Sequence, residues 1–265
     1  MMKKYYVIGN PIDHSLSPKL HNFWFRQNNI RAIYEKKKID NNNLQSIISE
    51  IKENKINGIN VTVPFKKAVI PYLDKLSPEA QKTQSVNTII LHNNCLVGHN
   101  TDIAGFTQAI KNLNFKIEGK KVFILGAGGV VPSIIFALRK MEVSKILISN
   151  RTREKAESLK NQFKDLEVID WGNMCNFDVI INATSIGIKD EVLTLDFSKV
   201  GSNKLFYDVI YNPSETQFLK TGKKLGNQVE NGKTMFIYQA LESFKLWHRI
   251  TPEVNKETFA ILEND

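Results

Sequence analysis

The chain has 265 residues, of which 42% are hydrophobic and 24% are charged, and its formal net charge is +9. This composition is ordinary for a soluble globular protein, and the length suits one large or two modest domains. No stretch approaches the roughly 20 apolar residues that span a bilayer, so we expect no membrane segment. The two cysteines lie far apart and fit neither a disulfide framework nor a metal-ligand pattern, so we expect a reducing, cytoplasmic environment and no bound metal.

The excess of basic residues is spread along the chain. Its longest uninterrupted run covers residues 36–38, and no aromatic residues are interleaved with it. Nucleic-acid binding is therefore disfavoured as the reason for the charge, against an anionic small molecule or simple solubility. We expect a small-molecule ligand and no nucleic-acid partner.

The first hundred residues are predicted to alternate between strands and helices. Apolar runs and period-two alternation predict strands at residues 5–9, 32–39, 58–64, 86–91 and 95–98. Helices are expected after Ser17, over residues 44–51, after Ser77 and after Asp102. The dipeptide Asn93-Asn94 predicts a tight hairpin turn between the last two strands.

Two serines stand out in the loop that follows the first strand. The sequence Ser17-Pro18 predicts that Ser17 is a helix N-cap and Pro18 the first helical residue, and capping alone would explain this serine. Ser15 has no such structural role. Two hydroxyls two residues apart could together bind a carboxylate. The neighbouring His14 and His21 are expected to be loop and surface residues.

Polar residues also mark the end of the strand that stops at Pro64. Asn60 and Thr62 share one face of this strand under period-two alternation. Because a strand of an α/β unit is largely buried, two hydrogen-bonding side chains at its carboxyl end suggest a binding site rather than an exposed polar face. Asp102, taken alone, is better explained as a helix cap with a favourable dipole position.

A glycine-rich turn at Gly126 organises the second half of the chain. The apolar run 121–125 ends in Gly126-Ala127-Gly128-Gly129, and a helical stretch with Pro132 in its first turn follows. Glycines let the backbone approach a ligand, and a helix N-terminus favours a pyrophosphate. The match to the dinucleotide fingerprint is partial, because Val131 stands where the third glycine is usual.

The next strand, 145–149, ends in Asn150-Arg151-Thr152. An NAD site usually has an acid here, whereas an NADP site has arginine for the 2′-phosphate. Since no acid follows the strand and Lys155 adds to the basic turn, we predict NADP(H). Solvated basic residues at a helix start are the alternative explanation. Further strand patterns at 179–182 and 206–210 predict a doubly wound, Rossmann-like α/β domain.

At this point the chain resembles the shikimate dehydrogenase family over essentially its whole length. The matching segments occur in the family's order, and together they are specific. They are Ser15-Leu16-Ser17-Pro18, Asn60-Val61-Thr62-Val63-Pro64-Phe65-Lys66, Val86-Asn87-Thr88, Asn100-Thr101-Asp102, Gly126-Ala127-Gly128-Gly129, Asn150-Arg151-Thr152, Asn182-Ala183-Thr184-Ser185, Tyr211-Asn212-Pro213 and Gln239-Ala240.

The resemblance implies two α/β domains with the active site between them. Residues 1–101 would form the substrate-binding domain, completed by C-terminal helices at 236–265, and residues 102–235 the Rossmann-like NADP-binding domain. It also implies the reaction, which is the reversible NADPH-dependent reduction of 3-dehydroshikimate to shikimate in the pathway to chorismate and the aromatic amino acids. We expect a monomer or a homodimer.

The resemblance further assigns roles to individual residues. Lys66 and Asp102 would be catalytic, since a ketone that accepts a hydride needs a cation or acid near its oxygen. Substrate would be bound by Ser15, Ser17, Asn60, Thr62, Asn87, Tyr211 and Gln239. Cofactor would be bound by Gly126, Ala127, Gly128, Gly129, Asn150, Arg151, Thr152, Lys155, Thr184, Ser185, Gly232 and Met235.

Some positions depart from the family's pattern. Lys155 stands where arginine is frequent, which leaves the 2′-phosphate more dependent on Arg151 because lysine lacks the bidentate fork. His99 stands where an acid is common, and nothing in the sequence explains it. Two alternatives stay open at this point: a quinate/shikimate dehydrogenase that uses NAD, and a non-catalytic relative that binds a shikimate-like ligand.

Overall fold

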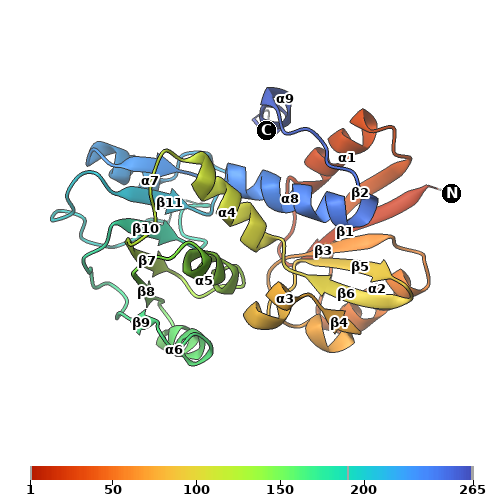
Figure 1. Cartoon of the computed structure of the whole chain (residues 1–265), viewed down its shortest axis with the longest axis horizontal. Coiled ribbons are helices and arrows are strands. Elements are labelled where there is room, and N and C mark those ends of the chain that lie inside the picture. Colours follow the sequence, from red (N-terminus) through yellow and green to blue (C-terminus); the bar gives the residue numbers. More distant parts are fainter. Residues whose placement is uncertain (1, 190, 264–265) are drawn as a thin grey trace. The chain divides into compact units, whose positions relative to one another are not determined.

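The computed structural model describes residues 2–189 and 191–263. The chain forms two compact units, Met1–Gly105 with Ile237–Asp265 (unit 1) and Phe106–Phe236 (unit 2) (Figure 1). The chain passes from one unit to the other inside two helices, α4 (Asp102–Asn112) and α8 (Lys233–His248). Unit 1 therefore contains both ends of the chain, and unit 2 is continuous in sequence.

Unit 1 is built on a mixed sheet of six strands in the order β2-β1-β3-β5-β6-β4. Strand β1 pairs in parallel with β2 and β3, β5 is antiparallel to β3 and β6, and β4 runs parallel to β6. The strands are β1 (Lys3–Gly9), β2 (Ala32–Lys38), β3 (Gly58–Val61), β4 (Lys75–Leu76), β5 (Thr88–His92) and β6 (Cys95–His99).

Helices pack on this sheet through their apolar faces. Helix α2 buries Ile47, Ile48 and Ile51 in one cluster with Ile59 of β3 and Leu96 of β6. The predicted hairpin is confirmed, because Asn93 and Asn94 both take positive φ, at 49° and 59°. Besides the start of α4 and the end of α8, the described part of unit 1 contains the helical segments α1 (Ser17–Gln27), η1 (Asn41–Asn43), α2 (Leu44–Lys52), η2 (Ile70–Tyr72), α3 (Pro78–Thr83) and α9 (Lys256–Ala260).

Unit 2 contains a parallel six-stranded sheet in the order β12-β11-β10-β7-β8-β9. The order reverses between β7 and β10, which is the point where open α/β sheets bind ligands at the carboxyl ends of their strands. The strands are β7 (Lys121–Leu125), β8 (Lys145–Ser149), β9 (Glu167–Val168), β10 (Val179–Asn182), β11 (Leu205–Asp208) and β12 (Gln228–Glu230).

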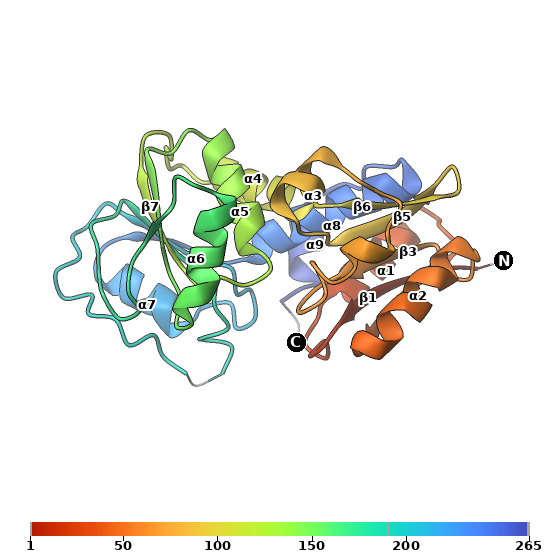
Figure 2. The same ribbon diagram turned by 90° about the horizontal axis from the view of Figure 1, so that it is seen from below.

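Three helices of unit 2 lie around this sheet (Figure 2). They are α5 (Val131–Lys140), α6 (Arg153–Gln162) and α7 (Gln217–Lys224). Helix α6 contacts β8 and β9, and α7 contacts β11 and β12. The predicted α/β architecture with a doubly wound nucleotide-type sheet is thus confirmed.

Two local predictions about helix α1 are wrong. Ser17 does not cap this helix, because the helix starts at Ser17, Leu16 is the N-cap residue and no side chain caps it. His21 is not a surface residue but is fully buried, at 0% exposed. Its ring stacks on Tyr34 and also contacts Phe244. Both corrections place polar groups of α1 inside the protein, where they need a function or a partner.

No helix in the described ranges is both long enough and apolar enough to cross a membrane. In the same ranges, no group of three or more His, Cys, Asp or Glu side chains is placed to hold a metal ion. Cys95 and Cys175 are both free thiols.

Candidate active site

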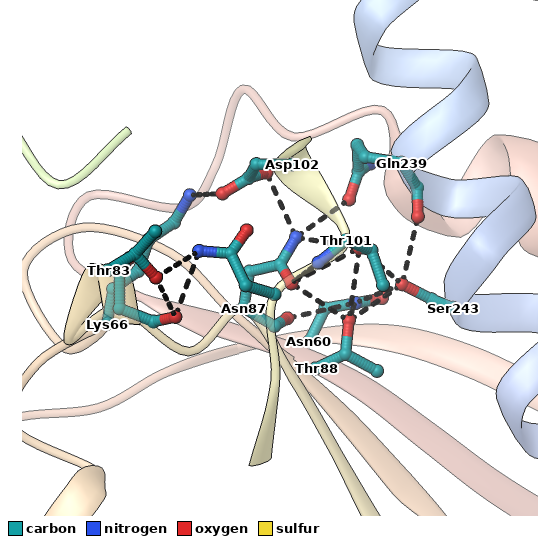
Figure 3. Close-up of polar contacts among 11 residues, drawn as sticks. Asn60, Lys66, Thr83, Asn87, Thr88, Thr101, Asp102, Gln239 and Ser243 are labelled. Carbon is teal, nitrogen blue, oxygen red and sulfur yellow. Dashed lines mark hydrogen bonds and ion pairs between the residues drawn. The ribbon is translucent and has the colours of Figure 1, made fainter. Parts of the chain in front are cut away.

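A buried ion pair in unit 1 joins Lys66 and Asp102 (Figure 3). Lys66 lies in the turn after β3, and Asp102 is the first residue of α4. The Lys66 Nζ atom is 2.5 Å from Asp102 Oδ2, and the two side chains are only 11% and 7% exposed. The Lys66 carbonyl accepts a hydrogen bond of 2.8 Å from the Val86 amide, which anchors the turn. The structure therefore presents an oriented ammonium group with little solvent around it.

Asn87 fixes the other side of the carboxylate. Its Nδ2 donates to Asp102 Oδ1 at 2.9 Å and to Thr101 Oγ1 at 2.9 Å, while its Oδ1 accepts from the Thr101 amide at 2.8 Å. Asp102 thus uses one oxygen for Lys66 and the other for Asn87. A capping role alone does not describe this aspartate, because its carboxylate is part of a three-residue arrangement.

A network of amides and hydroxyls continues from Asn87 to helix α8. Asn60 Nδ2 donates to Ser243 Oγ and Thr88 Oγ1, each at 3.0 Å, and to the Asn87 carbonyl at 3.0 Å. Gln239 Oε1 lies 3.4 Å from Asn87 Nδ2. Mutual hydrogen bonds of this kind hold polar side chains in one orientation before a ligand arrives.

The two serines of the first loop lie together in the structure. Ser15 Oγ is 3.2 Å from Ser17 Oγ and also accepts a bond of 3.4 Å from the Ser17 amide. Both residues are buried, at 8% and 7% exposed. Thr62, which follows β3, is half-buried, and its amide donates to the Ile8 carbonyl. Since no side chain caps α1, neither hydroxyl serves as the cap of this helix.

In unit 2, the glycine-rich turn lies at the point where the strand order reverses. Gly126 has φ +108°, and a Cβ atom there would lie 2.7 Å from the Ala183 carbonyl oxygen. Only glycine fits this position, because a side chain would be strained and would collide with backbone. The turns after β7 and β10 are therefore in direct contact, with Ala127, Gly128 and Gly129 next in the chain.

Of the residues after β8 that were predicted to bind the cofactor, one is hydrogen-bonded within the turn and the others are exposed. Asn150 Nδ2 donates to the Thr152 carbonyl at 2.7 Å, so this side chain shapes the turn. Arg151 is exposed and lines a cavity of about 330 Å³ together with Trp171, Ile186, Glu191, Val192 and Thr194. Arg153 is paired with Asp170 and Glu157. Lys155 is exposed.

The remaining predicted residues of unit 2 lie in loops after β10 and β11 or at the start of α8. The Thr184 hydroxyl donates to Asn182 Oδ1 at 2.7 Å, whereas Ser185 is exposed. Tyr211 stacks on Phe236, with ring centroids 4.5 Å apart. Gly232 and Met235, which were also predicted, are both buried. A Cβ atom at Gly232 would lie 2.1 Å from the Val209 carbonyl oxygen, so this position has no space for a side chain.

Comparison with known proteins identifies the family. The model of the shikimate dehydrogenase substrate binding domain matches residues 7–89, and that of shikimate / quinate 5-dehydrogenase matches residues 107–199. The NADP(+) shikimate dehydrogenase of Pelagibacter ubique is 52% identical over 264 residues, covering 99% of this chain and 100% of that protein. The chain belongs to the shikimate dehydrogenase family.

Solved structures of shikimate dehydrogenases agree with this assignment. The enzyme from Aquifex aeolicus superposes with a TM-score of 0.89 at 34% identity, covering 100% of this chain and 98% of that one. A shikimate dehydrogenase in complex with NADP+ gives a TM-score of 0.91 at 33% identity, with coverage of 99% and 95%. The two-domain shikimate dehydrogenase fold therefore extends over the whole chain.

Sequence reasoning missed several residues of this shikimate dehydrogenase structure. Ser243 and Tyr34 bond to Asn60 from another helix and another strand, and nothing near them in the sequence signals this. Asp208 did carry a signal, because it is an acid at the carboxyl end of a buried parallel strand. It accepts bonds from the Ile210 amide at 3.0 Å and the Thr216 hydroxyl at 2.6 Å, and also from Asn182 Nδ2, and burial raises its pKa to about 6.

Proposed function

We propose that this protein catalyses the reversible NADPH-dependent reduction of 3-dehydroshikimate to shikimate, in the pathway to chorismate and the aromatic amino acids. The observation that carries the proposal is the buried Lys66–Asp102 pair, oriented by Asn87. Family membership supports it, because relatives named as NADP(+) shikimate dehydrogenases cover the whole chain. Unit 1 is the proposed substrate domain and unit 2 the proposed NADP domain.

The pair fits the chemistry of ketone reduction. NADPH supplies the hydride when bound. Negative charge then develops on the ketone oxygen, and a preorganised cation with little competing water stabilises it. Lys66 donates a proton to this oxygen and recovers one from solvent, which completes the alcohol. Asp102 holds the ammonium in place, and in the reverse direction the same lysine accepts the proton.

The substrate carboxylate is assigned to the hydroxyls of Ser15 and Ser17, with Tyr211 of unit 2 as a further substrate residue. Thr62, Asn87 and Gln239 are assigned to the ring hydroxyls. Asn60 has both N–H groups engaged inside the protein, so only its carbonyl oxygen can accept a bond from the substrate. Such a site should strongly prefer the substrate over analogues that lack one of its hydroxyls, since such an analogue leaves buried hydrogen-bonding groups unpaired.

Unit 2 has the features that NADP requires. The turn at Gly126 packs against the Ala183 backbone so closely that only glycine fits, and Ala127, Gly128 and Gly129 continue the proposed pyrophosphate loop. Arg151 follows β8 and lines a cavity, so its guanidinium is the proposed partner of the 2′-phosphate, with Lys155 as a second cation. Other proposed cofactor contacts are Asn150, Thr152, Thr184, Ser185, Gly232 and Met235.

The same cavity contains Glu191, so the preference between NADP and NAD has to be measured. Purified protein is mixed with shikimate and either cofactor, and absorbance is followed at 340 nm. We expect fast reduction of NADP that drops at least tenfold in Arg151→Ala. Arg153→Ala is the matched control, because that guanidinium is already paired with Asp170 and Glu157.

Each other result points to one alternative. A preference for NAD would keep the reaction and contradict the role given to Arg151, as expected for a quinate/shikimate dehydrogenase. No reduction with either cofactor would indicate a binding protein or another substrate. We further propose a cytoplasmic location and a monomeric or homodimeric state, which sedimentation of the purified protein would test.

A further inference from the structure

Tyr34 is a buried residue that the proposed reaction does not use. It lies in the middle of β2 and is 1% exposed. Its ring belongs to an aromatic cluster with residues of α1 and α8, and it stacks on His21 with centroids 4.3 Å apart and planes 2° from parallel. The ring centroid of Trp247 lies 6.2 Å from that of Tyr34. These aromatic contacts fix the Tyr34 ring in place, and its hydroxyl is the one polar group of this side chain.

The hydroxyl of Tyr34 joins two groups that were assigned to substrate for separate reasons. It donates to Asn60 Oδ1 at 2.7 Å. It also shares a hydrogen bond with Ser17, which partly offsets the rise that burial causes in the pKa of Tyr34. Since Ser15 bonds to Ser17, a continuous hydrogen-bonded chain runs from the serine loop through Tyr34 to Asn60.

The balance of donors and acceptors at Asn60 makes this link specific. Both N–H groups of Asn60 go to Thr88, Ser243 and the Asn87 carbonyl. Its Oδ1 faces the Tyr34 hydroxyl, and the residue is only 6% exposed. Without that hydroxyl, a buried acceptor loses its donor, which is a costly state for a polar atom. The amide would then turn or draw in water.

His21 supports Tyr34 without competing for its hydroxyl. The ring of His21 is fully buried, and burial lowers its pKa to about 3, so the imidazole is neutral. Neither ring nitrogen has a hydrogen-bond partner within the described part of the chain. The neutral His21 ring stacks on the Tyr34 ring and so fixes the plane of that ring.

We propose that Tyr34 is a positioning residue of the substrate site, whose hydroxyl sets the orientation of Ser17 and Asn60 before substrate binds. The inference rests on the proposed function, because it takes those two residues as substrate contacts. When a substrate carboxylate accepts a hydrogen bond from the Ser17 hydroxyl, Tyr34 can still donate to Asn60, since the two bonds use different hydrogen atoms. Tyr34 therefore acts on substrate affinity rather than on the transfer of hydride.

Tyr34→Phe tests the inference, with Tyr5→Phe as the matched control. Tyr5 is also a buried tyrosine, and its ring packs in the same cluster against Phe25 and Trp247. We expect Tyr34→Phe to raise KM for shikimate about tenfold, with kcat and KM for NADP within twofold of wild type. Tyr5→Phe should leave all three within twofold. A Tyr34→Phe enzyme with unchanged KM for shikimate overturns the inference.

A double variant separates positioning from general stability. The part of the effect that runs through Asn60 is lost when the Asn60 side chain is absent, so Tyr34→Phe combined with Asn60→Ala should raise KM for shikimate above that of Asn60→Ala by much less than tenfold. A further tenfold rise in the double variant contradicts this path. The double variant also serves if Tyr34→Phe fails to fold, because removing both partners leaves no unpaired acceptor at this position.

Calorimetric binding of shikimate in the absence of cofactor tests the proposed reaction and the proposed role of Tyr34 separately. If wild type binds shikimate but does not oxidise it, the proposed function fails, and the ratio of Kd values between Tyr34→Phe and wild type still decides the inference. If wild type neither binds nor oxidises shikimate, both fail. If wild type is active and Tyr34→Phe binds shikimate equally well, only the inference fails.

Discussion

The two units of this protein prepare their candidate sites by different means. In unit 1, side chains hold one another, as Asn87 and Asp102 do around Lys66. In unit 2, the backbone does most of the work, because the turn at Gly126 lies against the Ala183 carbonyl too closely for any side chain. A small polyhydroxylated ligand needs several side-chain donors at fixed angles, whereas a pyrophosphate needs backbone that can approach closely.

Each unit also buries an ionisable group whose pKa is shifted, and the two groups are of opposite type. Unit 1 buries the neutral base His21, and unit 2 buries the acid Asp208. Burial lowers the pKa of His21 to about 3 and raises that of Asp208 to about 6. The two groups therefore make stability depend on pH in opposite directions, which allows each unit to be tested separately.

The largest expected effect is at Lys66. Lys66→Ala should lower kcat by roughly 10³-fold, because the developing oxyanion loses its cation and proton donor, while affinity for shikimate is largely kept. Steady-state rates and calorimetric binding of shikimate measure the two effects. Lys67→Ala is the control, since Lys67 is the exposed neighbour in the same turn. A Lys66→Ala enzyme with a near-normal rate would contradict the catalytic role.

The second effect concerns Asp208 in unit 2. A raised pKa means that the folded state holds its proton longer than the unfolded state, so stability falls as pH rises from the unfolded pKa near 4 to the folded pKa of about 6. Wild type should lose about 2 kcal/mol of unfolding free energy relative to Asp208→Asn between pH 4.5 and 7.5. Urea denaturation at each pH measures this. A constant difference between the two proteins would show that burial does not shift this carboxyl.

The third effect concerns Ser243 in unit 1. Ser243→Ala removes one of the three acceptors of Asn60 Nδ2, so KM for shikimate should rise about tenfold while KM for NADP stays unchanged. Ser49→Ala is the matched control, because Ser49 also donates to the carbonyl four residues earlier in its helix but lies on the surface. Equal changes in both KM values would show that the serine supports the fold rather than the substrate site.

The smallest effect concerns His21. A lowered pKa means that the unfolded state takes up the proton first, so stability is lost as pH falls below the unfolded pKa of about 6.5. Wild type should lose about 1 kcal/mol relative to His21→Phe between pH 7.5 and 5.5. His248, whose pKa is lowered to about 4, acts in the same direction in both proteins. Denaturation curves with no pH-dependent difference would contradict this.

Most of the fold could be predicted from local patterns, because each strand or helix is encoded by its own period of apolar residues. The two wrong predictions, the start of helix α1 and the exposure of His21, have physical explanations. Ser17-Pro18 fits a cap as well as a first turn, since proline is accepted at either of the first helical positions. His21 lies four residues after Ser17 and three before Trp24, so the helical spacing already placed it on the buried face.

Sequence reasoning could propose candidate site residues only where they lie in short motifs of the family that the chain resembles. Lys66 and Asp102 were identified through motifs, but the residues that hold Asn60 were not. Tyr34 is 26 positions from Asn60, and Ser243 is 183 positions away. Contacts over such separations depend on how strands and helices pack, and neither residue type signals a site by itself. Packing therefore decides which polar residues become partners.

The chain path of unit 1 has a consequence for synthesis. Unit 2, Phe106–Phe236, is continuous, whereas unit 1 needs Ile237–Asp265 to be complete. During translation, every residue of unit 2 is joined to the chain before Gln239 and Ser243 are added. Unit 1 is begun first and finished last, so its candidate site can be completed only after the whole of unit 2 has been synthesised.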